Sequence, residues 1–418
     1  MRPPMTKSPS DLLTCEEISR RRLLTWSGAF AASALIPAVP SLASSRDPRF
    51  LFVILRGALD GLSAVMPVGD PEFQRLRGGF LEDIAKAGEP LKLDGFFSLN
   101  PVMKSLSALY AKKEALVVHA AATPYRDRSH FDGQEILESG LPKAIHPDTG
   151  WLNRLVGHIG GKQKVEGRRR ERGISIGTFV PLVMRGPAPV LSWSPQHLPQ
   201  ASEDTVNRLL ALYEARDPML AEALRMGMAL DKDTRAMDTQ MQGRNQGPQA
   251  VLAMVEGAAR LLSKPDGPRI GALSIDGWDT HAGQGPGTGR LGKLLGTLDE
   301  VFLGLERGLG AVWKDTAIAI VTEFGRTVRI NGTAGTDHGT ATVAFLLGGA
   351  VKGGRIIADW PSLSANALHE GRDLKPTTDL RAVLKGVLTS HLGIDANFAG
   401  TSMFPESVAV KPLAGLTA

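Results

Sequence analysis

The chain has 418 residues, of which 43% are hydrophobic and 22% are charged. That hydrophobic content is enough to bury a full core in one large domain or two ordinary ones, and it excludes a disordered chain. The formal net charge is +5, and it falls to +3 without residues 1–43, which carry five Lys/Arg and three Asp/Glu. A charge this small excludes a typical nucleic-acid binder, so we expect no nucleic-acid partner.

The first 43 residues have the three-part order of a cleaved export signal. A polar stretch ends in Ser19–Leu24 (SRRRLL), an apolar run of about 14 residues covers Trp26–Val39, and small residues follow at Ser41–Ala43. The run is shorter than the roughly 20 residues that span a bilayer, so we expect cleavage after Ala43 and no membrane span in the mature protein. The paired arginines predict export of the folded protein by the twin-arginine translocase, to the periplasm or cell exterior. The alternative is an ordinary amphipathic first helix with an arginine cluster.

Cysteine use restricts the chemistry of the mature chain. Cys15 is the only cysteine, and it lies in the predicted leader. A mature protein without cysteine has no disulfide, thiolate metal ligand or Cys nucleophile. Metal binding would therefore rest on Asp, Glu and His, which suit a divalent cation such as Zn, Mn, Mg or Ca.

Apolar runs of strand length alternate with amphipathic stretches of helix length. This pattern predicts an α/β fold with a mostly parallel central sheet and helices on both faces. Strands are expected at Phe50–Leu55, Ala115–His119, Gly173–Ile176, Val190–Trp193, Ile270–Ile275, Thr316–Thr322 and Val343–Leu347. Helices are expected at Val102–Lys113, Val206–Met228, Gln249–Leu262, Arg290–Trp313 and Thr378–Leu392. Residues 44–418 are predicted to form a single domain, with a helical insertion at about 203–247.

Chemically active side chains gather directly after the predicted strands, which is where ligands bind in open α/β sheets. Each has an ordinary explanation as a turn residue, a helix cap or a buried histidine. Their coincidence at several strand ends instead favours a metal site. The candidates are Asp60 after the first strand, Arg126, Ser129 and His130 after the second, Asp279 and His281 after a later one, and Glu323, Arg326, Asp337 and His338 beyond Thr316–Thr322.

Five segments together resemble a known family. They are Leu55–Leu62 (LRGALDGL), Arg128–Asp132 (RSHFD), Gly277–His281 (GWDTH), Thr322–Thr327 (TEFGRT) and Thr336–Thr340 (TDHGT). In content and order they are similar to the exported bacterial domain-of-unknown-function family numbered fifteen hundred and one. That family in turn resembles the alkaline phosphatase and sulfatase superfamily of metal-dependent α/β proteins. The resemblance implies an exported, alkaline-phosphatase-like hydrolase of phosphate or sulfate esters, with a small anionic ester as its substrate.

The resemblance also implies roles for single residues. Asp60, Asp279, His281 and His338 would bind metal, with Asp337 beside them, and Glu323 would take the place of the carboxylate in the superfamily's Thr-x-Asp-His-Gly strand end. The sequence departs from that motif, because Phe324 follows Glu323 where the motif has histidine. This departure favours the alternative of a non-catalytic exported binding or assembly protein on the same fold. A redox enzyme is disfavoured, because the predicted mature chain has no cysteine and no G-x-G-x-x-G run directly follows a predicted strand.

The nucleophile is expected in the segment after the second strand. Ser129 is the first choice, as nucleophile or anion contact, with His130 as acid/base or ligand and Thr123 as a second candidate hydroxyl. In the other interpretation Ser129 is a helix N-cap and His130 a packing residue. Ala122 stands where a sulfatase carries its modified Cys or Ser, so a formylglycine sulfatase is not expected. Arg126, Arg128 or Arg326 would balance charge on the ester oxygens.

Overall fold

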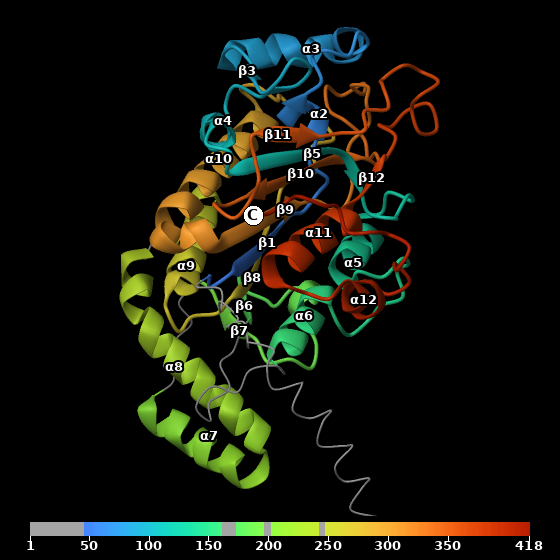
Figure 1. The fold of residues 1–418 in the computed structure, drawn as a ribbon. Coiled ribbons are helices and arrows are strands. Elements are labelled where there is room, and N and C mark those ends of the chain that lie inside the picture. Colours follow the sequence, from blue (N-terminus) through green and yellow to red (C-terminus); the bar gives the residue numbers. More distant parts are fainter. Residues whose placement is uncertain (1–45, 161–172, 196–201, 242–246) are drawn as a thin grey trace, which may run out of the picture. The chain divides into compact units, whose positions relative to one another are not determined.

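The computed structural model describes residues 46–160, 173–195, 202–241 and 247–418 (Figure 1). The leader predicted at residues 1–43 lies outside these ranges. Residues Pro48–Ala418 form one compact unit. No helix within the described ranges is both long enough and apolar enough to cross a membrane.

A nine-stranded sheet organises the described residues, in the order β11-β5-β10-β9-β1-β8-β6-β7, with β12 also paired to β5. All seven predicted strands are present, so the predicted α/β fold with a mostly parallel sheet is confirmed. Within this nine-stranded sheet, only β10 is antiparallel to its neighbours, β5 and β9. The strands are β1 (Arg49–Leu55), β5 (Ala115–Ala122), β6 (Gly173–Ile176), β7 (Leu191–Trp193), β8 (Ile270–Ile275), β9 (Thr316–Val321), β10 (Thr342–Leu347), β11 (Arg355–Ile357) and β12 (Thr378–Asp379).

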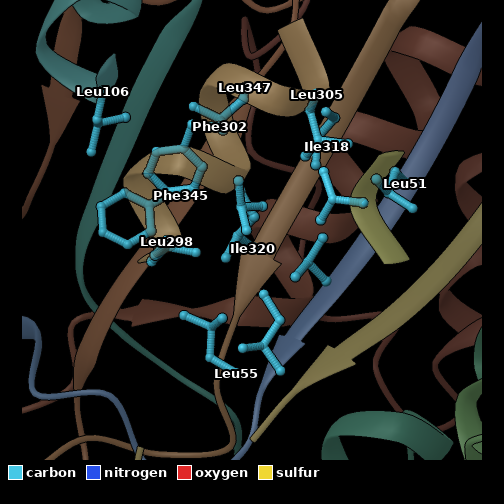
Figure 2. Close-up of a cluster of buried hydrophobic side chains, with 14 of the residues drawn as sticks. Leu51, Leu55, Leu106, Leu298, Phe302, Leu305, Ile318, Ile320, Phe345 and Leu347 are labelled. Atoms are coloured by element: carbon cyan, nitrogen blue, oxygen red, sulfur yellow. The ribbon is translucent and has the colours of Figure 1, made fainter. Parts of the chain in front are cut away.

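Helices cover both faces of this sheet, which explains why β1 is apolar at every position but its first. Leu51, Val53 and Leu55 pack with α4 (Lys104–Ala111), α9 (Gly247–Ser263) and α10 (Arg290–Leu309). Figure 2 shows part of this cluster, with α10 above β9 and β1. The alternate residues Phe50, Phe52 and Ile54 pack with α6 (Trp151–Gly160) and α11 (Leu380–Leu392). The central strand is therefore buried on both sides.

The remaining elements surround this core. The other helices and turns outside the insertion are α2 (Gly61–Ala64), α3 (Phe73–Ala87), α5 (His130–Ser139), α12 (Ala396–Phe398), the 3₁₀ turns Leu182–Met184 and Gly310–Asp315, and a π-helical turn at Ala399–Met403. A small antiparallel sheet pairs β2 (Val65–Met66) and β3 (Leu91–Lys92) with β4 (Ser98–Leu99). Helices α3, α5 and α6 were not predicted from the sequence.

The predicted insertion is helical, but the single helix expected at Val206–Met228 is wrong. Two helices stand there, α7 (Glu203–Arg216) and α8 (Pro218–Met241), which pack against each other. Asp217 separates them, because its carboxylate accepts the backbone N–H groups of Met219 and Leu220 at 3.1 Å. Pro218 then occupies the first helical position, where no N–H is needed.

Strand β5 carries a fully buried histidine. His119 Nε2 lies 3.0 Å from the carbonyl oxygen of Val65, and its Nδ1 accepts the N–H of Ala120 at 2.8 Å. The ring also stacks on Phe97. Burial lowers the pKa of His119 from 6.5 to about 4. The neutral ring is thus built into the fold, since a proton on Nδ1 would remove an acceptor.

Acid is therefore expected to weaken the fold through His119. Because its folded pKa is depressed, the unfolded chain binds more protons below pH 6.5, and stability is lost as pH falls from 6.5 towards 4. From pH 7 to pH 5 the contribution of this side chain should drop by about 2 kcal/mol. Urea denaturation across this range should show a shallower pH dependence in His119→Gln than in the wild type. Equal slopes in the two proteins would contradict this account.

Candidate metal centre

Five chain segments meet at one edge of the sheet. Parallel strands β1, β5, β8 and β9 end there, so the loops that follow them lie close together. Strand β10 is antiparallel to β9 and therefore begins at this edge. Residues that precede β10, including Asp337 and His338, consequently join residues that follow the other strands.

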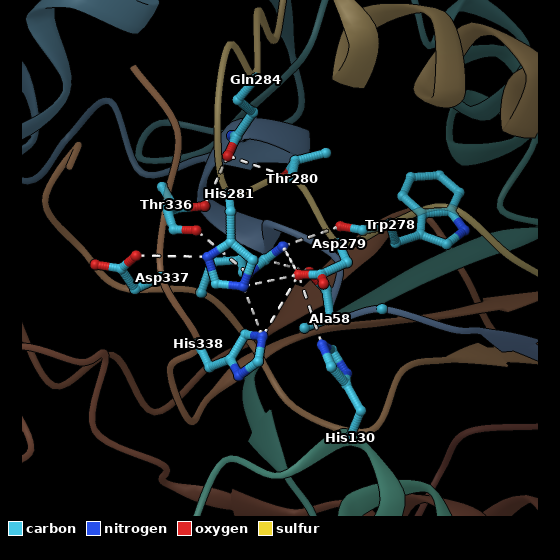
Figure 3. A network of polar contacts seen from close by, with 12 residues as sticks. Ala58, His130, Trp278, Asp279, Thr280, His281, Gln284, Thr336, Asp337 and His338 are labelled. Atoms are coloured by element: carbon cyan, nitrogen blue, oxygen red, sulfur yellow. Dashed lines mark hydrogen bonds and ion pairs between the residues drawn. The ribbon is translucent and has the colours of Figure 1, made fainter. Parts of the chain in front are cut away.

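Three histidines converge on one carboxylate oxygen at this edge (Figure 3). Asp279 Oδ1 lies 3.1 Å from His281 Nε2, 3.4 Å from His338 Nε2 and 3.5 Å from His130 Nε2. The Nε2 atoms of His281 and His338 are 2.9 Å apart. Ligand atoms of His130, Asp279 and His338 all lie within 4.8 Å of one another. We refer to these four side chains as the His₃Asp cluster.

The opposite ring nitrogen of each histidine is already engaged. His130 Nδ1 lies 2.8 Å from Glu323 Oε1, and His338 Nδ1 lies 2.8 Å from the carbonyl oxygen of Arg128. His281 Nδ1 lies 3.5 Å from Asp337 Oδ1. With Nδ1 donating, each Nε2 presents a lone pair, which is the usual arrangement of a metal-binding imidazole and its supporting acceptor. His130 Nε2 is buried and has no hydrogen-bond partner among the described residues, so the donor set fits a divalent metal.

Glu323 supports this cluster from behind. Its carboxylate is fully buried and accepts hydrogen bonds from His130, the Gly57 N–H, Gln134 Nε2 and Thr322 Oγ1 at 2.8–3.0 Å. Burial raises the pKa of Glu323, but the bonds from His130 and Gln134 outweigh it and hold that pKa below the usual range. The same contact raises the pKa of His130. Glu323, predicted as a ligand, therefore lies where it orients His130.

Arg326 fixes the shared carboxylate. Its side chain is 0% exposed, and Nη2 lies 2.6 Å from Asp279 Oδ1. The guanidinium also donates to the carbonyl oxygens of Ala58 at 3.0 Å and Thr336 at 3.2 Å. Burial raises the pKa of Asp279, yet Arg326 and His281 hold it below the usual range. Arg326, predicted to contact the ester, thus faces Asp279 and not solvent.

Asp60 does not join the cluster. Its buried carboxylate pairs with Arg77 of α3 at 2.6 and 3.1 Å, and it accepts bonds from Ser63 at 2.7 Å and Gln284 at 2.5 Å. Burial raises the pKa of Asp60, but Arg77 brings it below the usual range. Both carboxylate oxygens of Asp60 are therefore hydrogen-bonded within the protein. The structure therefore places this predicted ligand in a buried ion pair.

The predicted nucleophile region contributes His130 but no hydroxyl to the cluster. Ser129 Oγ accepts the Asp132 N–H at 3.5 Å and caps α5, as in the alternative interpretation. Thr123 Oγ1 lies 3.4 Å from the Glu323 carbonyl oxygen. Arg126 donates to the carbonyl oxygens of Thr123 and Tyr125. In the described part of the chain, neither hydroxyl is hydrogen-bonded to a cluster side chain.

Hydrogen bonds hold both the ring and the backbone carbonyl of His338. The carbonyl of Arg128 that accepts its Nδ1 belongs to a residue with φ of 64°, in the left-handed region. Buried Asp373 anchors the Arg128 side chain at 2.8 Å and also lies 3.0 Å from Arg372 Nε. Arg372 in turn donates to the His338 carbonyl oxygen at 2.6 Å. Sequence reasoning missed Arg372 and Asp373 because they belong to a distant loop.

Close backbone packing requires glycine at two positions around the cluster. A Cβ on Gly57, which has φ of 116°, would stand 2.5 Å from the Asp279 nitrogen. A Cβ on Gly335 would stand 2.1 Å from the His281 carbonyl oxygen. Any larger residue would push apart the loops that carry the ligands.

Replacing Glu323 by glutamine should weaken metal binding without removing a ligand. The neutral amide cannot match the carboxylate as an acceptor for His130, so metal affinity is expected to fall about 10- to 100-fold. Competition titration against a chromogenic chelator measures this change. Glu370→Gln is the matched control, because Glu370 pairs with Arg128 from an exposed position. Equal affinities for Glu323→Gln and wild type would show that Glu323 does not support a metal ligand.

Sequence comparison now identifies the family. The profile of the family described as Protein of unknown function (DUF1501) matches residues 105–399. The chain belongs to this family. Four of the five motif segments lie inside the matched range, which confirms the resemblance drawn from them. No curated protein matches the sequence.

Three of the solved structures that match this DUF1501 protein are only weakly similar to it. The C-terminal periplasmic domain of EcEptC from Escherichia coli, in complex with Zn, is 11% identical over 73% of this chain and 74% of that chain, with a TM-score of 0.32. The phosphonate monoester hydrolase of Agrobacterium radiobacter is 11% identical over 74% and 70%, with a TM-score of 0.33. A protein in the alkaline phosphatase superfamily from Vibrio parahaemolyticus is 12% identical over 95% and 80%, with a TM-score of 0.37. TM-scores this low support no assignment of metal or activity.

Proposed function

We propose that this DUF1501 protein is an exported metal-dependent hydrolase of phosphate or sulfate esters. The observation that carries the proposal is the convergence of three imidazole Nε2 atoms on Asp279 Oδ1, with each Nδ1 facing an acceptor. Such a set of neutral imidazoles with one carboxylate favours Zn or Mn over Mg or Ca, which prefer oxygen ligands. A bound metal of this kind would supply a Lewis acid and lower the pKa of a coordinated water.

Solvent access to the cluster favours a reactive centre over a purely structural one. The side chains of Asp279 and His281 are 43% and 45% exposed, whereas those of His130 and His338 are 23% and 24% exposed. Structural metal sites are closed, while catalytic sites keep an accessible position. The Asp279–His281 side is therefore where a substrate would approach. The motif resemblance supports an anionic ester as that substrate.

The surrounding residues would orient the metal ligands and transfer protons. Glu323 and the Arg128 carbonyl keep His130 and His338 in the Nδ1–H tautomer. Arg326 keeps Asp279 ionised and stationary. His281, the most exposed of the three histidines, stands where a proton would enter or leave, and Asp337 orients its ring.

Two observations favour a second function, that of a non-catalytic binding or assembly protein. The four converging side chains are enough to fill a tetrahedral metal site. The hydroxyls of Ser129 and Thr123 are engaged elsewhere, in a helix cap and near the Glu323 carbonyl. In that case the protein would hold metal without turning over esters.

Metal content and ester turnover of the same wild-type preparation decide between these functions. The protein should be purified from an exporting host without chelators and then assayed on aryl phosphates and aryl sulfates, before and after metal removal. We expect about one metal equivalent and turnover that is lost on chelation and restored by Zn or Mn. Metal without turnover would support the binding function, and absence of metal would overturn the proposed hydrolase and leave the binding or assembly function as the better one.

Export is proposed from the leader alone. Changing Arg20 and Arg21 together to lysine keeps the charge but removes the paired arginines that the twin-arginine translocase reads. We expect the mature protein to disappear from the periplasmic fraction and the precursor to accumulate in the cytoplasm. Unchanged export of the lysine variant would point to another route.

A further inference from the structure

A cavity of about 350 Å³ lies beside the His₃Asp cluster. It is formed by the loop between β9 and β10 together with one residue near Asp373. Its volume is in the range of small-molecule sites. The lining residues are Thr327, Arg329, Ile330, Asn331, Asp337 and Arg372.

The cavity shares its wall with the cluster. Asp337 Oδ1 lies 3.5 Å from His281 Nδ1, and Asn331 Nδ2 donates to the His281 carbonyl oxygen at 2.9 Å. On the other side, Arg372 donates to the His338 carbonyl oxygen at 2.6 Å. A group bound in the cavity would therefore lie next to the exposed side of the cluster.

The charged side chains that line the cavity differ in whether they are paired with other residues. Asp337 is held by Asn331 at 3.0 Å and by His281 at 3.5 Å. Arg372 is paired with Asp373. Exposed Arg329 differs, because no described residue forms a hydrogen bond or ion pair with its guanidinium. Arg329 therefore gives the cavity a positive charge that no described residue pairs with, and all its donors are available.

We propose that this cavity binds a second anionic group of the substrate, a carboxylate, phosphate or sulfate distinct from the ester that is cleaved. Arg329 supplies a planar donor pair suited to such a group. The adjoining cluster then receives the scissile ester of the same molecule. The inference rests on the proposed hydrolase function and narrows it to esters that carry an additional negative charge.

A matched pair of probes tests the cavity. Phenyl phosphate and 3- or 4-carboxyphenyl phosphate differ only by the added carboxylate, and the corresponding sulfates form a second pair. In the wild type, kcat/KM should be about 10- to 100-fold higher for the carboxylated ester, the range expected for hydrogen bonds to a charged group. Arg329→Gln should bring the ratio close to one, and Arg329→Lys should keep part of it. Arg208→Gln, which alters an exposed arginine of α7, should leave the ratio and both rates unchanged.

Equilibrium binding separates failure of the cavity from failure of the hydrolase function. If wild-type protein turns over neither probe, equilibrium dialysis of the same two probes still compares the wild type with Arg329→Gln. Tighter binding of the carboxylated probe, lost in Arg329→Gln, would support the cavity without catalysis. Equal binding or equal turnover of the two probes by the wild type would overturn the inference. A preference that survives in Arg329→Gln would do the same.

Discussion

Replacing Asp279 by alanine is expected to abolish metal binding and to lower ester turnover at least about a thousandfold. Asp279 Oδ1 is the atom on which the Nε2 atoms of His130, His281 and His338 converge. Its loss removes the only carboxylate of the cluster, and loss of the metal removes several kcal/mol of transition-state stabilisation. Elemental analysis and kcat on the best aryl ester measure the two effects.

The same loop provides the control for this prediction. Asp276 is exposed and precedes Asp279 by three positions, so Asp276→Ala should keep both metal and turnover. Because Asp279→Ala also leaves buried Arg326 without its ion pair, Asp279→Asn is the second variant, which keeps an acceptor for Arg326 while weakening the ligand. Thermal denaturation verifies that each variant is folded. Full metal content in a folded Asp279→Ala protein would refute the proposed centre.

Breaking the Asp60–Arg77 pair is expected to cost stability and leave metal content unchanged. Both side chains are 1% exposed, so Arg77→Met would leave a buried carboxylate without its partner. This should lower the free energy of unfolding by about 3–5 kcal/mol. Asp60→Asn should also destabilise the fold while the metal remains bound. If Asp60→Asn instead lost metal and kept its stability, Asp60 would be a ligand, as the motif resemblance implies. Urea denaturation and elemental analysis distinguish the two roles.

A second ion pair, close to Arg77 in sequence, shows how much burial contributes to the stabilisation by such a pair. Arg75 pairs with Glu72 near the surface, with side chains 57% and 31% exposed. Arg75→Met should change stability by no more than about 1 kcal/mol.

The contribution of Asp60 to the stability of the fold should also depend on pH. Because its folded pKa is below the ordinary 3.8, its stabilisation is present above that value and is lost as pH falls through the folded pKa.

The position of Asp60 illustrates a limit of motif transfer. An aspartate after the first strand has the sequence context of a metal ligand, and nothing local distinguishes it from one. Its actual partner, Arg77, lies on α3, a helix that the sequence pattern did not predict. The pairing is decided by how α3 packs against the end of β1, so it could not be inferred from the strand-end motif.

The members of the His₃Asp cluster could be predicted from the sequence more fully than the role of Asp60. Asp279, His281 and His338 were predicted to lie together because residues that follow parallel strands share an edge of the sheet. For His338 the underlying geometry is different, since it precedes antiparallel β10 and does not follow a parallel strand. His130 was given as acid/base or ligand, and the structure places its Nε2 beside Asp279.

The sequence by itself determined the alternation of strands and helices, the apolar sheet and the strand ends at which reactive side chains gather. These are local properties, because burial on both faces makes a strand apolar along its whole length. Only the tertiary structure decided which side chains meet. Glu323 orients His130 across 193 positions of sequence, and Gly57 donates to Glu323 across 266. Such contacts depend on strand order and direction, which no local sequence pattern encodes. The contacts also show which residues can hold a metal and which residues only support the metal ligands.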